Sequence, residues 1–251
     1  MDFLKSERVA ARFQYLQQTG STNTDLVTLV TANPADFPHL SVLVAGEQTA
    51  GRGRSGRVWV SPPEKSLAIS VLVKPSGWSL TDYAWLPLVA GVAMRRAVAE
   101  SLPASDVSLK WPNDVQVGGK KISGILSELL ADGGGVVIGA GINLTLNRDE
   151  LPIVESTSLA LEGWNETSDD FLFAYLTHLK DLLSDFNRAT DVVRNECRTI
   201  GLQVRAIFPD AREVIGLATG IDVGGRLLIS VPGENQLLAV SAADIQHLRH
   251  N

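Results

Sequence analysis

The residues with the clearest chemistry lie in a glycine-rich segment in the first quarter of the chain. Residues 51–57 read Gly-Arg-Gly-Arg-Ser-Gly-Arg, so the guanidinium groups of Arg52, Arg54 and Arg57 fall within six residues. Guanidinium groups bind phosphate oxygens in pairs. The segment also matches the dinucleotide-binding pattern G-x-G-x-x-G, but that interpretation requires a following helix, and two consecutive prolines exclude one. We therefore expect a flexible loop that binds a polyanion such as a triphosphate; a solvated basic loop or an RNA-binding patch is an equally open alternative.

A compact polar motif occupies positions 110–114, where the sequence reads Lys-Trp-Pro-Asn-Asp at the end of an expected strand. Proline cannot continue a central strand, so the backbone should leave the sheet here and expose Asn113 and Asp114. An amide beside a carboxylate can position Mg²⁺ and phosphate oxygens. Taken alone, the motif is more typical of a turn capped by asparagine and aspartate.

Two lysines follow the turn predicted at Gly118-Gly119. Because side chains alternate along a strand, Lys120 and Lys121 should point to opposite faces, one toward solvent and the other toward a ligand. A lysine facing inward can hold a substrate carboxylate and an α-phosphate together and offset the repulsion between them. Two exposed hairpin lysines are otherwise the common case.

Several uncharged residues offer hydrogen bonds. Ser21-Thr22-Asn23 can cap a helix or present hydroxyl and amide groups to a polar ring such as a urea, and Gln48 has the same two interpretations. Trp59 offers a flat face to a planar ligand such as adenine, although a lone tryptophan more often serves packing. Residues 139–143, Gly-Ala-Gly-Ile-Asn, end a buried strand where a ligand can approach the backbone, and Asn143 can either bind an adenine edge or serve the fold.

The elements that must position these residues follow from the hydrophobic pattern. Helices are predicted over residues 24–31 and 82–102, from Thr167 or Ser168 onward, and over 191–199. Strands are predicted over 40–45, 67–73, 108–114, 115–117, 122–127 and 136–144. After Gly201 the short strands 204–208, 213–219, 226–231 and 236–241 follow closely. Such spacing predicts a small β-barrel or sandwich, with a domain boundary near residue 200.

The composition narrows the class of protein. The 251 residues carry a net charge of −6 and a pI near 5.2, which argues against broad charge-driven binding of nucleic acid. No apolar run approaches the ~18 residues of a membrane-spanning helix. Residues 1–11 lack the order of a secretory signal, and the single cysteine, Cys197, cannot form an internal disulfide. We therefore expect a cytoplasmic protein that does not bind a membrane.

The order and spacing of the motifs resemble those of the bacterial biotin–protein ligases. The resemblance is dense over residues 19–145 and extends to Gly220-Ile221-Asp222 and Gly225-Arg226-Leu227. It implies an α+β fold in which a mixed β-sheet is flanked by helices, as in class II aminoacyl-tRNA synthetases and lipoate ligases. The catalytic domain would span residues 1–200, and an SH3-like β-barrel would span residues 201–251.

The resemblance also implies the site residues. The catalytic residues would be Lys121, Arg54 and Asp114, and Asp114 would also hold Mg²⁺. Biotin would be bound by Ser21, Thr22, Asn23, Gln48, Gly51, Arg52, Gly53, Arg54, Lys121 and Gly124. The nucleotide would be bound by Arg54, Arg57, Trp59, Asn113, Lys121 and Asn143.

The implied reaction consumes biotin and ATP with Mg²⁺, forms biotinyl-5′-AMP, and passes biotin to a lysine of the biotin carboxyl carrier domain of a biotin-dependent carboxylase. Asp114 would orient or deprotonate that lysine. A lipoate–protein ligase is the nearest alternative, but lipoate has no urea ring to engage Ser21 to Asn23 and Gln48. A non-catalytic nucleic-acid-binding protein is the second alternative.

Repressor members of the resembled group carry an N-terminal DNA-binding module of roughly 60 residues. Only some 20 residues precede Ser21, so DNA binding is not expected. Monomer and homodimer both remain open.

Overall fold

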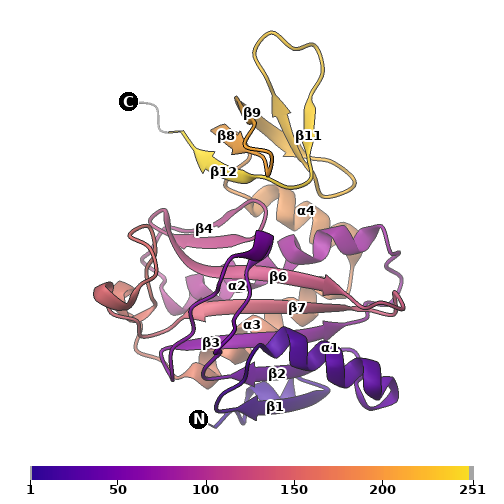
Figure 1. The fold of residues 1–251 in the computed structure, drawn as a ribbon, viewed down its shortest axis with the longest axis vertical. Coiled ribbons are helices and arrows are strands. Elements are labelled where there is room, and N and C mark those ends of the chain that lie inside the picture. Colours follow the sequence, from indigo (N-terminus) through magenta and orange to yellow (C-terminus); the bar gives the residue numbers. More distant parts are fainter. Residues whose placement is uncertain (1, 249–251) are drawn as a thin grey trace.

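The large sheet of the protein has seven strands (Figure 1). The computed structural model describes residues 2–248, without the side chain of Ser55. In sheet order the strands are β1 (Arg12–Leu16), β2 (Ser41–Ala45), β3 (Ser66–Val73), β7 (Val136–Asn143), β6 (Lys120–Leu129), β5 (Asp114–Val117) and β4 (Val107–Lys110). β1 and β2 are parallel, and the remaining neighbours are antiparallel.

Helices cover the two faces of this sheet unequally. α2 (Leu86–Ser101) and α3 (Ser168–Leu183) lie behind it in Figure 1, and α4 (Phe186–Glu196) packs against both of them. α1 (Thr22–Ala32) packs on the opposite face, over β2, β3 and β7. Alternate residues of β3 serve the two sides: Ile69 joins the core under α2 and α3, whereas Leu72 packs with Leu26 of α1. Both faces of the central strands are therefore buried over most of their length, which explains their continuous apolar sequences.

The second sheet is antiparallel and has the order β11 (Leu238–Val240), β10 (Leu227–Ser230), β9 (Glu213–Ile221), β8 (Gln203–Ile207) and β12 (Asp244–His247). Two buried tryptophans connect it to the rest of the molecule. Trp85 Nε1 donates to the carbonyl of Val223 at 2.8 Å, and Trp111 Nε1 donates to the carbonyl of Gly225 at 3.2 Å. The small sheet therefore rests beside the β4 edge of the large one (Figure 1).

The remaining helical turns are short 3₁₀ segments at Ser6–Arg8, Pro34–Asp36, Arg54–Gly56, Asp82–Trp85, Arg148–Glu150 and Ala160–Glu162. No helix among residues 2–248 is long and apolar enough to cross a membrane.

The expected fold class is confirmed: a mixed sheet flanked by helices is followed by a small β-structure. The expectation of a last helix over 191–199 is wrong at both ends: α4 begins at Phe186, where the Asp185 side chain accepts a capping hydrogen bond from Arg188 N, and it ends at Glu196. The predicted helix over 82–102 starts as a 3₁₀ turn, and its α-helical part starts at Leu86. The edge strands β1 and β12 were not anticipated. The second sheet begins at Gln203, and the division at residue 200 stays a prediction.

Candidate active site

Glycines take the place of larger side chains on the α1 face of the large sheet where β6 and β7 meet. Gly124 of β6 pairs with Gly141 of β7, and Gly139 lies two residues away on the same face. A Cβ atom at Gly139 would lie 2.4 Å from Asn23 Oδ1, and one at Gly141 would lie 2.2 Å from Trp59 Cε2. Gly124, Gly139 and Gly141 therefore form a flat surface, the glycine floor, on which other groups can approach the backbone closely.

Uncharged hydrogen-bonding groups gather where α1 begins. Gln48 Oε1 accepts from the backbone N of Thr22 at 2.9 Å and from its Oγ1 at 3.1 Å. Ser70 Oγ, from β3, lies 2.8 Å from Thr22 Oγ1 and 2.6 Å from Asn23 Oδ1. Ser21 occupies the N-cap position of α1, yet its side chain makes no capping bond. Ser21 thus stands at the start of the helix as expected but does not cap it with its side chain, and its contact with a ligand stays a prediction.

Lys121 lies toward the other end of the glycine floor. Its Nζ is 2.6 Å from Asp114 Oδ1 and 5.9 Å from the ring centroid of Trp59, whereas Lys120 is exposed. Strict alternation would place Lys120 on the face of Gly124, but the β5–β6 pairing shifts register between Lys121 and Ser123, and Lys121 is the lysine that reaches the floor. A Cβ at Gly124 would lie 3.3 Å from Lys121 Nζ, which places this ammonium directly above the floor.

Further charges surround Lys121. Arg54 Nη1 donates to Asn113 Oδ1 at 3.1 Å, and Asn113 Nδ2 donates to the carbonyl of Ile125 at 2.8 Å. The expectation that Asn113 and Asp114 are exposed is wrong, because the β5–β6 hairpin and residues 51–57, the arginine loop, leave both half-buried. Asn113 links the arginine loop to β6, so the loop is held over the sheet and is not free in solvent.

The charged end has a surplus of positive charge. Four cations, those of Arg54, Arg57, Lys110 and Lys121, lie within electrostatic reach of two carboxylates, Asp114 and Asp244. Burial lowers the pKa of Lys110 and that of Arg54, and Asp114 opposes both shifts. Cations that are partly stripped of water and incompletely balanced favour an anionic ligand.

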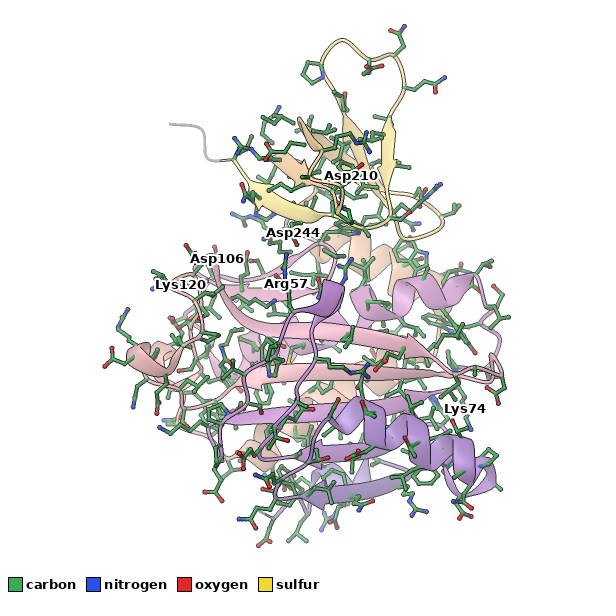
Figure 2. All side chains as sticks on the ribbon, in the orientation of Figure 1. Arg57, Lys74, Asp106, Lys120, Asp210 and Asp244 are labelled. Atoms are coloured by element: carbon green, nitrogen blue, oxygen red, sulfur yellow. The ribbon has the colours of Figure 1, made fainter. Side chains whose placement is uncertain are left out.

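Residues of the small sheet reach this end. Arg57, at the tip of the arginine loop, bonds to Asp244 of β12, and Figure 2 shows the pair at the junction of the two sheets. Sequence reasoning did not identify Asp244, because β12 is a short strand with no apolar run.

The glycines of the arginine loop allow its two arms to approach each other closely and form a hairpin. Gly51 O accepts from Trp59 N at 2.9 Å, and Gly53 N donates to the carbonyl of Arg57 at 2.7 Å. A Cβ at Gly51 would lie 2.4 Å from the carbonyl oxygen of Trp59, so a side chain there would push the two arms apart. The loop is therefore a narrow hairpin whose tip carries Arg54 and Arg57.

Of the two expected adenine contacts, Trp59 lies on the glycine floor, and Asn143 ends β7 two residues after Gly141. The Trp59 ring rests on Gly124 and Gly141, and its Nε1 is buried without a hydrogen-bond partner. Asn143 is 3% exposed and donates from Nδ2 to the carbonyl of Thr157 at 2.9 Å. Asn143 thus serves the fold through one end of its amide, and its contact with adenine stays a prediction.

Sequence reasoning also missed Ser70 and Glu128. Glu128 accepts from Asn23 Nδ2 at 2.8 Å and forms an ion pair with Arg52. Both residues could have been found by alternation, because Glu128 shares a face of β6 with Gly124, and Ser70 shares a face of β3 with Leu72.

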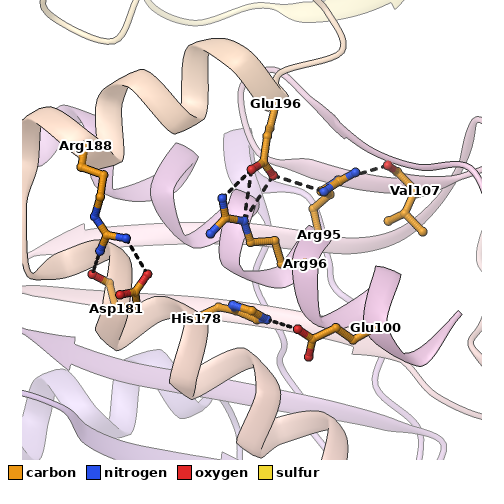
Figure 3. A network of polar contacts seen from close by, with 8 residues as sticks. All are labelled: Arg95, Arg96, Glu100, Val107, His178, Asp181, Arg188 and Glu196. Carbon is orange, nitrogen blue, oxygen red and sulfur yellow. Dashed lines mark hydrogen bonds and ion pairs between the residues drawn. The ribbon is translucent and has the colours of Figure 1, made fainter. Parts of the chain in front are cut away.

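The helix side of the molecule carries a different charged region, whose groups are balanced among themselves (Figure 3). Glu196 accepts from both Arg95 and Arg96, and Asp181 pairs with Arg188 at 2.8 Å. A hollow of about 330 Å³ beside α2 and α3 is lined in part by the carboxylates of Glu100, Glu166 and Asp170. Neither this charged network nor this hollow has the surplus of positive charge that favours an anionic ligand around Lys121.

Comparison with known proteins identifies the family. The Biotin/lipoate A/B protein ligase family matches residues 15–143. The chain is 36% identical to a biotin–[acetyl-CoA-carboxylase] ligase of Mycobacterium tuberculosis, over 92% of this chain and 87% of that relative. It is similar to the structure of the Aquifex aeolicus biotin protein ligase in complex with biotin and ATP (TM-score 0.76, 26% identity, 95% of this chain and 100% of that one). The Leishmania major biotin protein ligase in complex with biotinyl-5-AMP is also similar (TM-score 0.65, 26% identity, 96% and 99%). The chain therefore belongs to the biotin/lipoate A/B protein ligase family and, within it, to the biotin protein ligases.

Proposed function

We propose that this protein forms biotinyl-5′-AMP from biotin and MgATP and transfers the biotin to a lysine of the carrier domain of a biotin-dependent carboxylase. The observation that carries the proposal is the two-ended site. Uncharged hydrogen-bonding groups lie at one end of the glycine floor and surplus positive charge at the other. Gly139 and Gly141 are about 7 Å apart along β7. This arrangement suits a ligand with a neutral urea ring at one end and an acid group at the other.

In the first half-reaction, the biotin carboxylate attacks the α-phosphorus of ATP, and pyrophosphate leaves. Two anions must meet, so the main task of the protein is to compensate charge. Lys121 lies at the proposed meeting point and would exchange Asp114 for the substrate oxygens. Arg54, Arg57 and Lys110 would hold the phosphates that depart.

Mg²⁺ is best described as part of the substrate MgATP. No cluster of three or more histidine, cysteine, aspartate or glutamate side chains within the described part of the chain could hold a metal ion. When substrate phosphates supply most of the ligands, Mg²⁺ needs only one or two protein carboxylates. Asp114 is the carboxylate beside Lys121 and fits that role.

In the second half-reaction, the neutral amine of a carrier lysine attacks the acyl carbon of the adenylate. AMP leaves, and the amine loses a proton. We propose that Asp114 orients this amine or accepts its proton once Lys121 is bound to phosphate. The arginine loop would exclude water and protect the mixed anhydride until then. Because ATP is a substrate, the cytoplasm is the proposed location.

The decisive test is incubation of the protein with biotin, MgATP and a biotin-acceptor domain, followed by measurement of the acceptor's mass. A gain of one biotinyl group that requires ATP supports the proposal. Lipoyl transfer in a parallel reaction with lipoate, without biotinyl transfer, would favour the lipoate ligase alternative. Salt-sensitive retention on RNA or DNA without ATP turnover would favour a nucleic-acid-binding protein.

A further inference from the structure

We infer that Glu128 is a positioning residue whose single carboxylate holds both the biotin-binding amide of Asn23 and the base of the arginine loop. Filling of the site and closure of the loop are thereby coupled. The inference rests on the proposed function for the identity of the ligand. The coupling itself follows from contacts among β6, α1 and the loop.

The contacts form a continuous chain across the site. Arg52 Nη2 donates to both oxygens of Glu128, at 2.9 and 2.8 Å. Asn23 Nδ2 donates to Glu128 Oε2 at 2.8 Å and to the carbonyl of Leu126 at 3.3 Å. At its other end, Asn23 Oδ1 lies 2.6 Å from Ser70 Oγ. Both ends of the Asn23 amide are thus engaged, and Glu128 defines which end is the donor.

The position of Glu128 explains why it reaches two partners. Gly124 and Glu128 lie on the same face of β6, so the carboxylate stands beside the glycine floor on the side of α1. The loop hairpin crosses this face (Figure 1) and brings Arg52 to the same carboxylate. A residue on the opposite face of β6, such as Ile125, is in the core and could not contact either partner.

The strength of the Arg52–Glu128 pair suits a reversible closure. The side chains are 48% and 29% exposed, and ion pairs of such exposure are individually weak. The loop can therefore open to admit substrates. The Asn23–Glu128 bond strengthens when Asn23 is held in place by a ligand, because an ordered donor loses less freedom on binding the carboxylate. A ligand at Asn23 would thus favour the closed loop.

Two substitutions separate the two contacts. Glu128→Gln keeps an oxygen that can accept from Asn23 but removes the charge that holds Arg52. Glu128→Ala removes both. Asp181→Asn is the matched control, since it removes the charge from a partly exposed ion pair with Arg188 on the helix side, away from the site (Figure 3).

Trypsin provides a readout that does not depend on activity, because it cleaves after Arg52, Arg54 and Arg57. We expect Glu128→Gln to be cleaved in the loop about threefold to tenfold faster than the unsubstituted protein, with a biotin dissociation constant within about threefold. We expect Glu128→Ala to show the same faster cleavage, a biotin dissociation constant raised about tenfold, and no protection of the loop by biotin. Asp181→Asn should match the unsubstituted protein in cleavage, affinity and biotin protection.

Loop cleavage and biotin affinity unchanged in Glu128→Ala would overturn the inference. If Glu128→Gln and Glu128→Ala lost biotin affinity equally, the loss would come from the missing negative charge and not from the missing hydrogen bond to Asn23. That result would also contradict the inference. If the unsubstituted protein binds no biotin, the proposed function fails. The comparison of loop cleavage without ligand still tests whether Glu128 holds the loop through Arg52. Thermal unfolding identifies a misfolded variant. Should Glu128→Ala misfold, Glu128→Gln still tests the contact between Glu128 and Arg52.

Discussion

The two ends of the glycine floor hold their side chains by different means. At the α1 end, neutral hydrogen bonds join Thr22 to Gln48 and Ser70, and Asn23 is held by Ser70 and by the carboxylate of Glu128, so their orientations are set before a ligand arrives. At the other end, side chains are held by ion pairs such as Lys121–Asp114, in which a phosphate can replace the carboxylate. The comparison suggests a division of labour. We propose that the fixed α1 end selects the ligand, because unmatched polar groups are costly to bury, and that the charged end lowers the barrier to reaction.

Removal of Lys121 should have the largest effect. Lys121→Ala leaves the biotin carboxylate and the α-phosphate without their shared cation, so biotin-dependent ATP–pyrophosphate exchange should fall at least about 10³-fold. Biotin affinity should change far less, because the α1 end is intact. The exposed neighbour supplies the control, Lys120→Ala, which should retain normal exchange. Full exchange in Lys121→Ala would refute the assignment.

The arginine loop should protect the intermediate. Arg54→Gly removes the bond to Asn113 that holds the loop over the sheet. We expect biotinyl-5′-AMP to escape about 10-fold to 100-fold faster, while its formation continues, because one charged hydrogen bond is lost. Chromatographic detection of free adenylate checks this. Tighter retention of the adenylate in Arg54→Gly would contradict the protective role.

A change at the neutral end should alter selection and not rate. Thr22→Ala removes a hydroxyl that lies between Gln48 and Ser70, so KM for biotin should rise about tenfold with kcat and KM for ATP little changed. Thr28→Ala, on an exposed turn of the same helix, is the control. An equal loss in kcat would show that the two ends do not have separate tasks.

The smallest effect concerns stability at the junction beside the charged end. Burial lowers the pKa of His247 from its usual value to about 4, with Lys110 and Arg198 contributing, and its Nε2 lies 3.0 Å from Thr199 Oγ1. The unfolded chain binds this proton more readily, so stability present above about pH 6.5 is lost as the pH falls toward about 4. Between about pH 7 and about pH 5, the Tm of His247→Gln should fall less than that of the unsubstituted protein. Equal falls in Tm would contradict the assignment.

Much of the architecture could be predicted from the sequence because apolar periodicity and turn residues are local signals. The hairpin at Gly118-Gly119 is the clearest case, since both glycines have positive φ, 56° and 80°. The edge strand β12 could not be predicted in this way. Its residues Asp-Ile-Gln-His present one apolar side chain, and the strand is defined by its pairing with β8.

The same limit applies to the site. Lys121 and the arginine loop were identifiable because their residue types are chemically distinctive. Alternation places Glu128 on the face of Gly124, but its partner Arg52 could not be predicted, and neither could the pairing of Asp244 with Arg57, because each pair joins segments more than 70 residues apart in the chain. Long-range pairing of this kind depends on sheet order, which no local pattern specifies.

The most direct test of the two-ended site is a crystal structure with biotinyl-5′-AMP bound. The urea ring should lie against Thr22, Asn23 and Gln48, and the acyl phosphate should contact Lys121 with Arg54 closed above it. An adenylate bound in the reverse direction, or one held away from the surface formed by Gly124, Gly139 and Gly141, would contradict the division of the site into a selecting end and a reacting end.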